Sequence, residues 1–452
     1  MDLNKIYLAK LIQTNNQTYL FDALTNSVIA LPQNADYDNN TISDKNYYKL
    51  IKDNNLRDFT KYIEFKVDYP YTDLELSDLV NNKMQSITLA LTEQCNLRCK
   101  YCGYMPKYLK TPCELNEMNE IILIKSVEML LRSYFIGKLP PSISFYGGEP
   151  LLKFDLIKKV IKYCKNNYLF CKPNYYITTN GLLLGNDEII EFLIENNFYL
   201  TVSLDGPQSI QDKYRIQSDG RPSFNKVFEN VTKLYKYNPR FFKEHVTFNS
   251  VVGPTTGTIE QYEFLEKLCK MEIVLIDCNI TNHFSKLIEK EKLTPVDELI
   301  KAQNHSLIKK SILKNMQKYH TLLSAPSFQQ YIFPGGFCIP GTRKNFITTD
   351  GKIIVCEKVN ENEAMYQIGD IFNGVDINKV KKLIYTTVEK TQKCKTCWAA
   401  KFCSICFKDI FNLTDEFCKK SRNRIERELA YYLENIKNNR KLTNYLDNLS
   451  IE

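Results

Sequence analysis

The sequence predicts an α/β protein built on a parallel sheet. Between residues 85 and 300, short apolar stretches typical of strands alternate with longer amphipathic stretches typical of helices. Strands separated by helices form β-α units with parallel strands, and ligands bind at the carboxyl ends of such strands. The stretches with strand character are residues 87–91, 143–146, 175–179, 199–204, 246–252 and 273–276.

Composition narrows the function classes. The chain has 452 residues, enough for two or three domains, with 44% hydrophobic and 25% charged residues. The net charge of +8 is mild, and no Lys/Arg block with interleaved aromatics indicates nucleic acid. We see no secretory signal and no apolar run of about 18 residues that would span a bilayer. The 15 Cys cluster in tight groups, which favours metal or cluster binding in a reducing cytoplasm over disulfides.

Residues 1–84 precede the first cysteine group. Residues 6–12, 18–21 and 27–31 are predicted to form short strands around polar turns. Two interpretations are open for this N-terminal module. It is either a structural cap on the next domain or a peptide-docking module, in which an extended leader adds a strand to a sheet edge.

The central motif is Cys95-x3-Cys99-x2-Cys102, directly after the first predicted strand. Three thiolates at this spacing can bind an iron–sulfur cluster and leave one iron without a protein ligand, so that a substrate or cofactor can bind there. Zinc ligands or buried structural cysteines are the alternatives. A second motif, Gly147-Gly148-Glu149-Pro150, ends the next predicted strand.

Together these motifs resemble those of the radical S-adenosylmethionine (radical SAM) enzymes. The resemblance implies a partial (β/α)6 TIM-type barrel and a 4Fe–4S cluster on Cys95, Cys99 and Cys102, whose open iron is chelated by S-adenosylmethionine. It also implies reductive cleavage of that cofactor to a 5′-deoxyadenosyl radical, with electrons from a donor such as ferredoxin or flavodoxin.

The resemblance extends to the cofactor pocket. Glu149 is expected to hold the methionine ammonium, while Ser203 and Arg215 hold the carboxylate and ribose side. Gln211 stands where the family has His. Tyr101 is either an adenine contact or a core tyrosine. The expected cofactor-binding residues are Tyr101, Gly147, Gly148, Glu149, Thr179, Asn180, Ser203 and Arg215.

A second cysteine-rich region runs from residue 338 to 418. Only five residues separate Cys397 from Cys403, too few for a zinc ribbon. The pattern resembles the SPASM extension of radical SAM enzymes, except that the last pair is spaced x2 rather than x3. The resemblance implies two auxiliary 4Fe–4S clusters, making three in total. Auxiliary cluster I would use Cys338, Cys356 and Cys406 and have an open iron; auxiliary cluster II would use Cys394, Cys397, Cys403 and Cys418.

Two further features lie near these ligands. Residues 345–355 predict a hairpin with an Asp350-Gly351 turn. Glu357 falls where sulfatase-maturing relatives carry an acidic residue that takes a substrate proton; a commonplace surface Glu is the alternative. The remaining thiols follow no ligand spacing and are interpreted as buried or incidental: Cys113, Cys164, Cys171, Cys269 and Cys278.

The expected organisation has five parts. These are an N-terminal α+β module (1–84), a radical SAM partial barrel (85–300), a helical connector (301–335), a SPASM domain (336–425) and a helical tail (426–452). The expected function is a cytoplasmic maturase that forms thioether cross-links in a ribosomally made precursor peptide. Alternatives are a formylglycine-forming sulfatase maturase, a carbon–carbon cross-linking cyclase and a zinc-dependent nucleic-acid-binding protein. The N-terminal module, the missing fourth ligand and Glu357 weigh against formylglycine formation.

Overall fold

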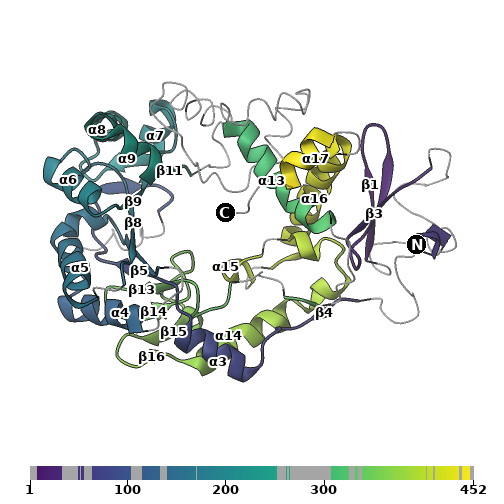
Figure 1. Cartoon of the computed structure of the whole chain (residues 1–452), viewed down its shortest axis with the longest axis horizontal. Helices are drawn as coiled ribbons and strands as arrows, with labels where there is room; N and C mark the ends of the chain where they lie inside the picture. Colours follow the sequence, from purple (N-terminus) through teal and green to yellow (C-terminus); the bar gives the residue numbers. More distant parts are fainter. Residues whose placement is uncertain are drawn as a thin grey trace. The chain divides into compact units, whose positions relative to one another are not determined.

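The computed structural model consists of two compact units (Figure 1). The central-sheet unit comprises Tyr71–Asn282 and Cys338–Leu383, and the terminal unit comprises Met1–Pro70, His283–Phe337 and Ile384–Glu452. Each unit is described by itself. The described residues are 8–32, 49–50, 52–54, 64–102, 115–132, 140–168, 171–251, 261, 264, 307–324, 331–333, 338–403, 405–410, 413–436 and 440–447.

The predicted parallel sheet is confirmed. Its strands lie in the order β11-β9-β8-β7-β5, and each neighbouring pair is parallel. The predicted strand at 273–276 lies outside the described residues. The strands are β5 (Ser86–Ala90), β7 (Ser142–Tyr146), β8 (Asn174–Thr179), β9 (Tyr199–Ser203) and β11 (Val246–Asn249).

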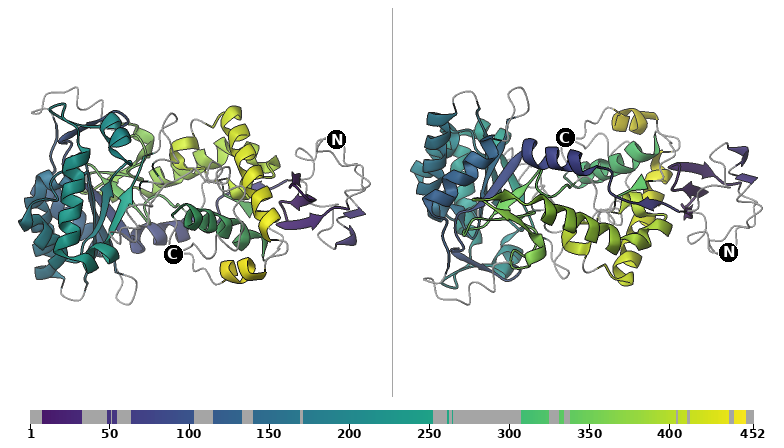
Figure 2. Two further views of the ribbon diagram at one scale, coloured as in Figure 1. Left: turned by 90° about the horizontal axis from the view of Figure 1, so that it is seen from above. Right: turned by 90° about the horizontal axis from the view of Figure 1, so that it is seen from below.

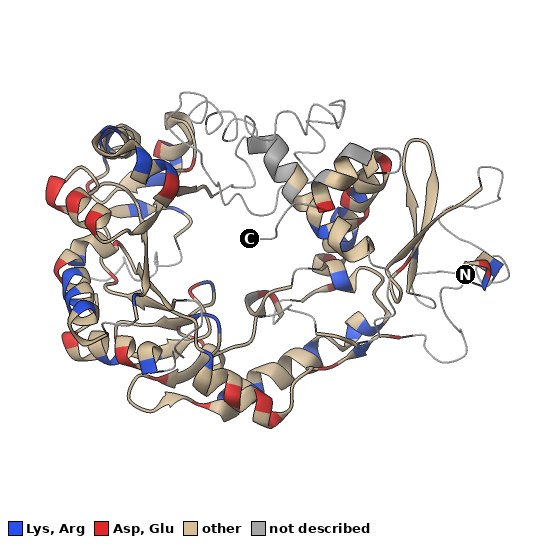
Figure 3. Cartoon of the chain, viewed as in Figure 1, with Lys and Arg blue, Asp and Glu red and all other residues tan. Residues whose placement is uncertain are grey.

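Amphipathic helices pack along one side of these strands (Figure 1, and the blue-to-teal part of Figure 2). In α5, the buried residues Ile157, Val160, Ile161 and Cys164 recur every three or four positions, which places them on one face. Both signs of charge are interspersed on the helices (Figure 3). The helices of this part are α3 (Asp73–Asn82), α4 (Glu120–Arg132), α5 (Phe154–Asn167), α6 (Asp187–Glu195), α7 (Gln208–Tyr214), α8 (Phe224–Tyr237) and α9 (Pro239–His245), with a 3-10 turn at Pro150–Lys153.

The same sheet continues beyond β5 through a later part of the chain. β13 (Asn345–Ile347) pairs with β5 in parallel, and β14 (Lys352–Ile354), β15 (Gln367–Asp370) and β16 (Gly374–Val375) follow in antiparallel order. The predicted hairpin is thus confirmed, with Gly351 at a φ of +84° in its turn. This pairing ties Cys356 and Glu357, which directly follow the hairpin, to the sheet that carries the first two motifs.

A short antiparallel pair connects two motifs of the site. β6 (Leu97–Cys99) pairs with β10 (Arg215–Gln217), and Arg215 lies opposite Cys99 in the register. No sequence pattern predicted these three-residue strands. The pairing fixes Arg215 beside the cysteine motif.

The terminal unit contains the predicted three-stranded N-terminal sheet. β1 (Ala9–Gln13), β2 (Thr18–Asp22) and β3 (Ser27–Ala30) are antiparallel neighbours. Other elements of this unit are α13 (Leu307–Leu323), α15 (Phe407–Ile410), α16 (Asp415–Ile436), α17 (Arg440–Asp447), the paired β4 (Lys66–Val67) and β12 (Tyr331–Ile332), and 3-10 turns at Gln392–Thr396 and Ala400–Phe402. The helix α14 (Ile377–Lys390) and a 3-10 turn at Ala364–Tyr366 complete the described elements.

The N-terminal sheet packs on the cysteine-rich segment of its own unit. The Phe21 ring lies 6.3 Å from Trp398 and 5.5 Å from Phe402, measured between ring centroids. Lys401 Nζ donates to the carbonyl of Leu24 at 3.2 Å. The face of the sheet that carries Phe21 is therefore covered by this cysteine-rich segment. Among the described helices, none has the length and apolar character that crossing a bilayer requires.

Candidate active site

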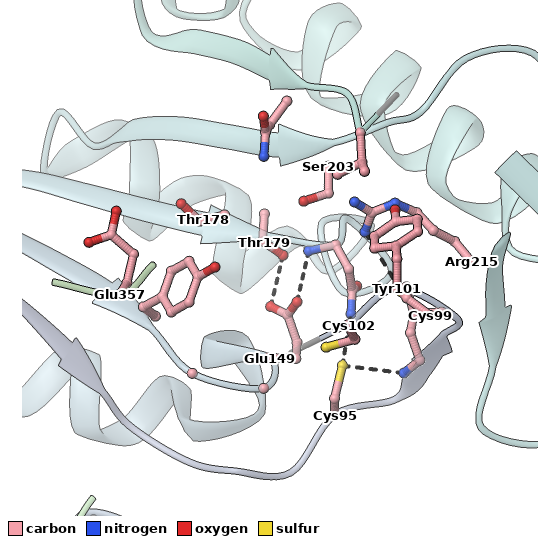
Figure 4. A pocket seen from close by; sticks show the side chains of 17 residues that line it. Cys95, Cys99, Tyr101, Cys102, Glu149, Thr178, Thr179, Ser203, Arg215 and Glu357 are labelled. Atoms are coloured by element: carbon pink, nitrogen blue, oxygen red, sulfur yellow. Dashed lines mark hydrogen bonds between the residues drawn. The ribbon is translucent and has the colours of Figure 1, made fainter. Parts of the chain in front are cut away.

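A cavity of about 280 Å³ lies at the carboxyl ends of the parallel strands (Figure 4). Every residue predicted for the first cluster, its cofactor and the base lines this one cavity. Five further lining residues were not predicted: Leu97, Tyr146, Thr178, Asn249 and Val251. Three of these, Tyr146, Thr178 and Asn249, lie at or next to the ends of β7, β8 and β11, so the strand assignment itself was the signal that could have found them.

The three thiols of the first motif face this cavity. Cys99 is buried, and Cys95 and Cys102 are half-buried. Cys95 Sγ accepts from Leu97 N at 3.4 Å and from Asn180 Nδ2 at 3.7 Å. Burial raises the pKa of the Cys99 thiol to about 11, opposed by the charge of Arg215. Three sulfurs around one cavity, with donors to two of them, are a donor set that fits an iron–sulfur cluster.

Glu149 is a fully buried carboxylate on the cavity wall. Its Oε1 accepts from the Thr179 hydroxyl at 2.8 Å and from Leu151 N at 3.1 Å, and its Oε2 accepts from Asn180 N at 2.8 Å. Burial nevertheless raises its pKa to about 7. Thr179 and Asn180 thus hold Glu149 in place, and the fixed carboxylate fits a cationic group in the cavity.

The two glycines of the second motif allow two loops to lie close together. A Cβ at Gly147 would collide with the Thr92 carbonyl, and one at Gly148 with the Gln94 carbonyl. Without side chains, Gly148 N donates to Thr92 O at 2.7 Å. The expectation that these glycines free the backbone for a ligand is therefore refined: they bring the end of β7 against the loop that leads to Cys95.

Asp205 is a buried residue that sequence reasoning missed, although it lies two positions after the predicted Ser203. Its Oδ2 accepts from Arg215 Nε at 3.0 Å and from the Tyr101 hydroxyl, and its Oδ1 accepts from Val251 N at 3.0 Å. Gln211, the residue at the family's His position, accepts from Asp205 N at 2.8 Å. Asp205 therefore fixes both Tyr101 and Arg215.

Arg215 and Tyr101 pack beside Cys99. Arg215 Nη1 donates to Cys99 Sγ at 3.9 Å, and its guanidinium carbon lies 5.4 Å from the centroid of the Tyr101 ring. Burial raises the pKa of Tyr101. Tyr101 is 38% exposed and lines the cavity, which is compatible with a ligand contact as well as with its role in this network.

Glu357 lies at the other end of the cavity, near Thr178 and away from Arg215 (Figure 4). Its Oε2 is buried and has no hydrogen-bond partner among the described residues. The nearest cation is Lys344, whose Nζ is 3.9 Å from the other carboxylate oxygen. Burial, and then the charge of Glu357, raise the pKa of Tyr146. The three thiols therefore lie at one end of the cavity, called the thiol end below, and Glu357 lies at the other.

The comparisons with known proteins agree with this geometry. Residues 89–268 match the model of the radical SAM superfamily. This chain carries a radical SAM domain. S-adenosylmethionine and a 4Fe–4S cluster are the cofactors of that family, and the three thiols and Glu149 form a site that fits them.

Two relatives and one solved structure extend the match. A cysteine-type anaerobic sulfatase-maturating enzyme of Clostridium novyi is 27% identical over 336 residues, 70% of this chain and 86% of its own. A radical SAM cyclopropyl synthase of Paramaledivibacter caminithermalis is 28% identical over 185 residues, 38% of this chain and 36% of its own. The structure of native anSMEcpe with bound AdoMet and Cp18Cys peptide has a TM-score of 0.58 at 19% identity, covering 81% of this chain and 99% of that one, which shows a shared fold.

The chain has a second cavity, of about 160 Å³, in its terminal unit. Cys394, Cys397, Cys403 and Cys418 all line it, as predicted for auxiliary cluster II. Burial, and then the three neighbouring thiols, raise the pKa of Cys394 to about 12. Among the described residues, no group of His, Cys, Asp or Glu converges as the ligands of a single metal ion would. Four thiols that line one cavity are a donor set that an iron–sulfur cluster can use.

The ligands predicted for auxiliary cluster I divide between the units. Cys338 is exposed and Cys356 half-buried in the central-sheet unit, and Cys406 is half-buried in the terminal unit. Their shared cluster stays a prediction. Of the spare thiols, Cys164 is buried on α5 and Cys171 is half-buried, while Cys113, Cys269 and Cys278 lie outside the described residues.

Proposed function

We propose that this radical SAM enzyme is a maturase that oxidises a residue within a peptide or protein chain. The observation that carries the proposal is the carboxylate of Glu357, whose buried Oε2 has no hydrogen-bond partner in the described part of the chain and lies in the cavity lined by the three predicted cluster thiols. A carboxylate in that position can take a proton from a substrate. The relatives named as sulfatase-maturating enzymes support a polypeptide substrate.

The cofactors supply the radical chemistry: a 5′-deoxyadenosyl radical that removes a hydrogen atom from substrate carbon. In our proposal Cys95, Cys99 and Cys102 hold the cluster, and Glu149 pairs with the methionine ammonium. Thr179 and Asn180 act through Glu149 as positioning residues. Ser203 and Arg215 bind the carboxylate and ribose side, and Arg215 does so from a position fixed by Asp205.

The substrate's hydrogen atom, proton and electron need separate destinations. The hydrogen atom leaves with the deoxyadenosyl group and the proton goes to Glu357. The remaining electron goes to an auxiliary iron–sulfur cluster, for which we propose the two cysteine sets, Cys394, Cys397, Cys403 and Cys418, and Cys338, Cys356 and Cys406. An external donor such as ferredoxin or flavodoxin reduces the first cluster.

Three products are compatible with this common chemistry. The first candidate is a thioether from a Cys sulfur to carbon in a ribosomally made precursor peptide, because the N-terminal sheet has a partly exposed edge strand, β3, to which a leader can add a strand. The second is formylglycine, favoured by the Clostridium novyi relative, which the chain matches over 86% of that enzyme's length. A carbon–carbon cross-link is a third product of the same radical.

The products are distinguished by mass spectrometry after anaerobic incubation with reductant, S-adenosylmethionine and a peptide. The peptides compared are one encoded beside the gene and one carrying a cysteine sulfatase motif. A thioether loses two hydrogens and a free thiol but keeps its sulfur. Formylglycine from Cys exchanges sulfur for oxygen and also loses two hydrogens, and a carbon–carbon link leaves the thiol count unchanged. Absence of 5′-deoxyadenosine with every peptide contradicts the proposed function.

Glu357→Gln should separate cofactor cleavage from product formation. Without the base, product formation should fall by about 10²-fold or more, while 5′-deoxyadenosine is still released. The matched control is Glu363→Gln, an exposed carboxylate six residues later in the chain. Product formation by Glu357→Gln at the rate of the control would rule out the proposed base.

S-adenosylmethionine binding should tighten as pH rises through about 7. The pKa of Glu149 is raised to about 7, so at lower pH the group is mostly neutral and cannot pair with an ammonium. Between pH 6 and pH 8 its ionised fraction rises roughly tenfold, and the Kd should fall by about the same factor. Equilibrium dialysis with the oxidised protein measures this, and Glu149→Gln should remove the dependence. A pH-independent Kd in the wild type would contradict it.

A further inference from the structure

The four-thiol cavity of the terminal unit is also lined by two cations, Lys393 and Arg422. Lys393 Nζ lies 3.4 Å from Asp415 Oδ1, and Asp415 lines the same cavity, so this charge is compensated locally. Arg422 follows Cys418 by four residues on α16, which places the guanidinium and the thiol on one helix face. Among the described residues, Arg422 has no carboxylate within ion-pair distance, whereas Lys393 has Asp415.

Arg422 also contacts the other segment of the ligand set. Burial raises the pKa of the Cys397 thiol, and the backbone N–H of Ala399 and the side chain of Arg422 act in the opposite direction. The next carboxylate on the same helix face, Glu426, pairs with Lys10 at 3.0 Å. The charge of Arg422 therefore acts on the thiols of Cys397 and Cys418.

The effect of such a contact on a cluster has a definite sign. Four thiolates around a four-iron core give the cluster a net negative charge, which grows by one when it accepts an electron. A cation hydrogen-bonded to a ligand sulfur stabilises the more negative state, and hydrogen bonds to sulfur are among the determinants of cluster potentials. The buried setting strengthens the interaction.

We propose that Arg422 raises the reduction potential of the cluster in the four-thiol cavity and so makes this cluster an electron acceptor. Arg422 is a positioning residue, because it acts through the Cys397 sulfur. The inference rests on the proposed iron–sulfur assignment of this cavity and adds the residue that sets its redox behaviour.

The test uses the full chain after anaerobic reconstitution. A redox titration of this protein is monitored by electron paramagnetic resonance. Changing Cys95, Cys99 and Cys102 together to Ala removes the first cluster's signal, and Cys394→Ala in that background identifies the signal of the four-thiol cavity. Arg422→Gln should shift the midpoint potential of that signal to more negative values with unchanged iron and sulfide content. The matched control is Lys420→Gln on the same helix, because the Lys420 side chain is 75% exposed and pairs with Glu416 at 2.6 Å.

The outcomes distinguish the two levels of the proposal. A full iron content with the wild-type potential in Arg422→Gln overturns the role of Arg422 and leaves the cluster assignment intact. A chain without any signal that depends on Cys394 overturns the cluster assignment. If Arg422→Gln loses iron, Arg422→Met gives the measurement, because it removes the charge and keeps an unbranched side chain. A shift of the potential in the same direction supports the inference, and an unchanged potential overturns it.

Discussion

Cys99→Ala should abolish formation of 5′-deoxyadenosine from S-adenosylmethionine. Cys99 is buried at the thiol end of the cavity, where Arg215 and Tyr101 pack beside it. Two remaining thiolates cannot hold a four-iron cluster with a single open iron, so cofactor binding and cleavage are lost together. Anaerobic assay with dithionite should show activity at background, and iron analysis should show a loss of about four irons per chain.

Cys171→Ala is the matched control for this prediction. Cys171 is a half-buried thiol outside the two cavities described, and its loss should change neither the iron content nor the cleavage rate. If Cys99→Ala still consumes S-adenosylmethionine at the rate of Cys171→Ala, the site is not the one described.

Asp205→Asn should destabilise the central-sheet unit by about 3–5 kcal/mol, the usual cost of removing one partner of a buried ion pair. The side chains of Asp205 and Arg215 are 1% and 8% exposed, so the guanidinium would remain buried without its counter-charge. The Tyr101 hydroxyl would lose its charged acceptor in the same step. S-adenosylmethionine binding should weaken as well, because Arg215 and Tyr101 would no longer be held.

Hydrogen exchange of β9 and β11 amides, followed by mass spectrometry, measures this loss within the unit concerned. The single Trp lies at position 398 in the terminal unit, so fluorescence would report on the other unit. Asp219→Asn removes one partner of an exposed pair with Arg221 and should leave exchange nearly unchanged. Equal protection in the two variants would contradict the buried network.

The sequence predicted those parts of the structure that depend on local pattern. Apolar runs predicted β5, β7, β8 and β9, and the spacing of three cysteines predicted the thiol end of the cavity. The relation of Glu149 to those thiols followed from its place at the end of a parallel strand. These features need only the identity of neighbouring residues.

The remaining features depend on pairing between distant segments, which short polar stretches do not specify. β6 and β10 have three residues each and pair across more than a hundred positions, so no periodicity indicated them. Asp205 lies two positions after the predicted Ser203, but its partners Tyr101 and Arg215 come from other elements. Glu357 reaches the cavity because β13 adds to β5, a contact with no local signal.

The packing of the N-terminal sheet limits how this region can be exchanged between enzymes. Phe21 fills a space beside Trp398 and Phe402, and the turn after β2 is held by Lys401, a residue between two of the proposed cluster ligands. A chimera that transplants the sheet to test the proposed leader docking must therefore carry these partners with it. Otherwise the graft would disturb a metallocentre before it altered recognition.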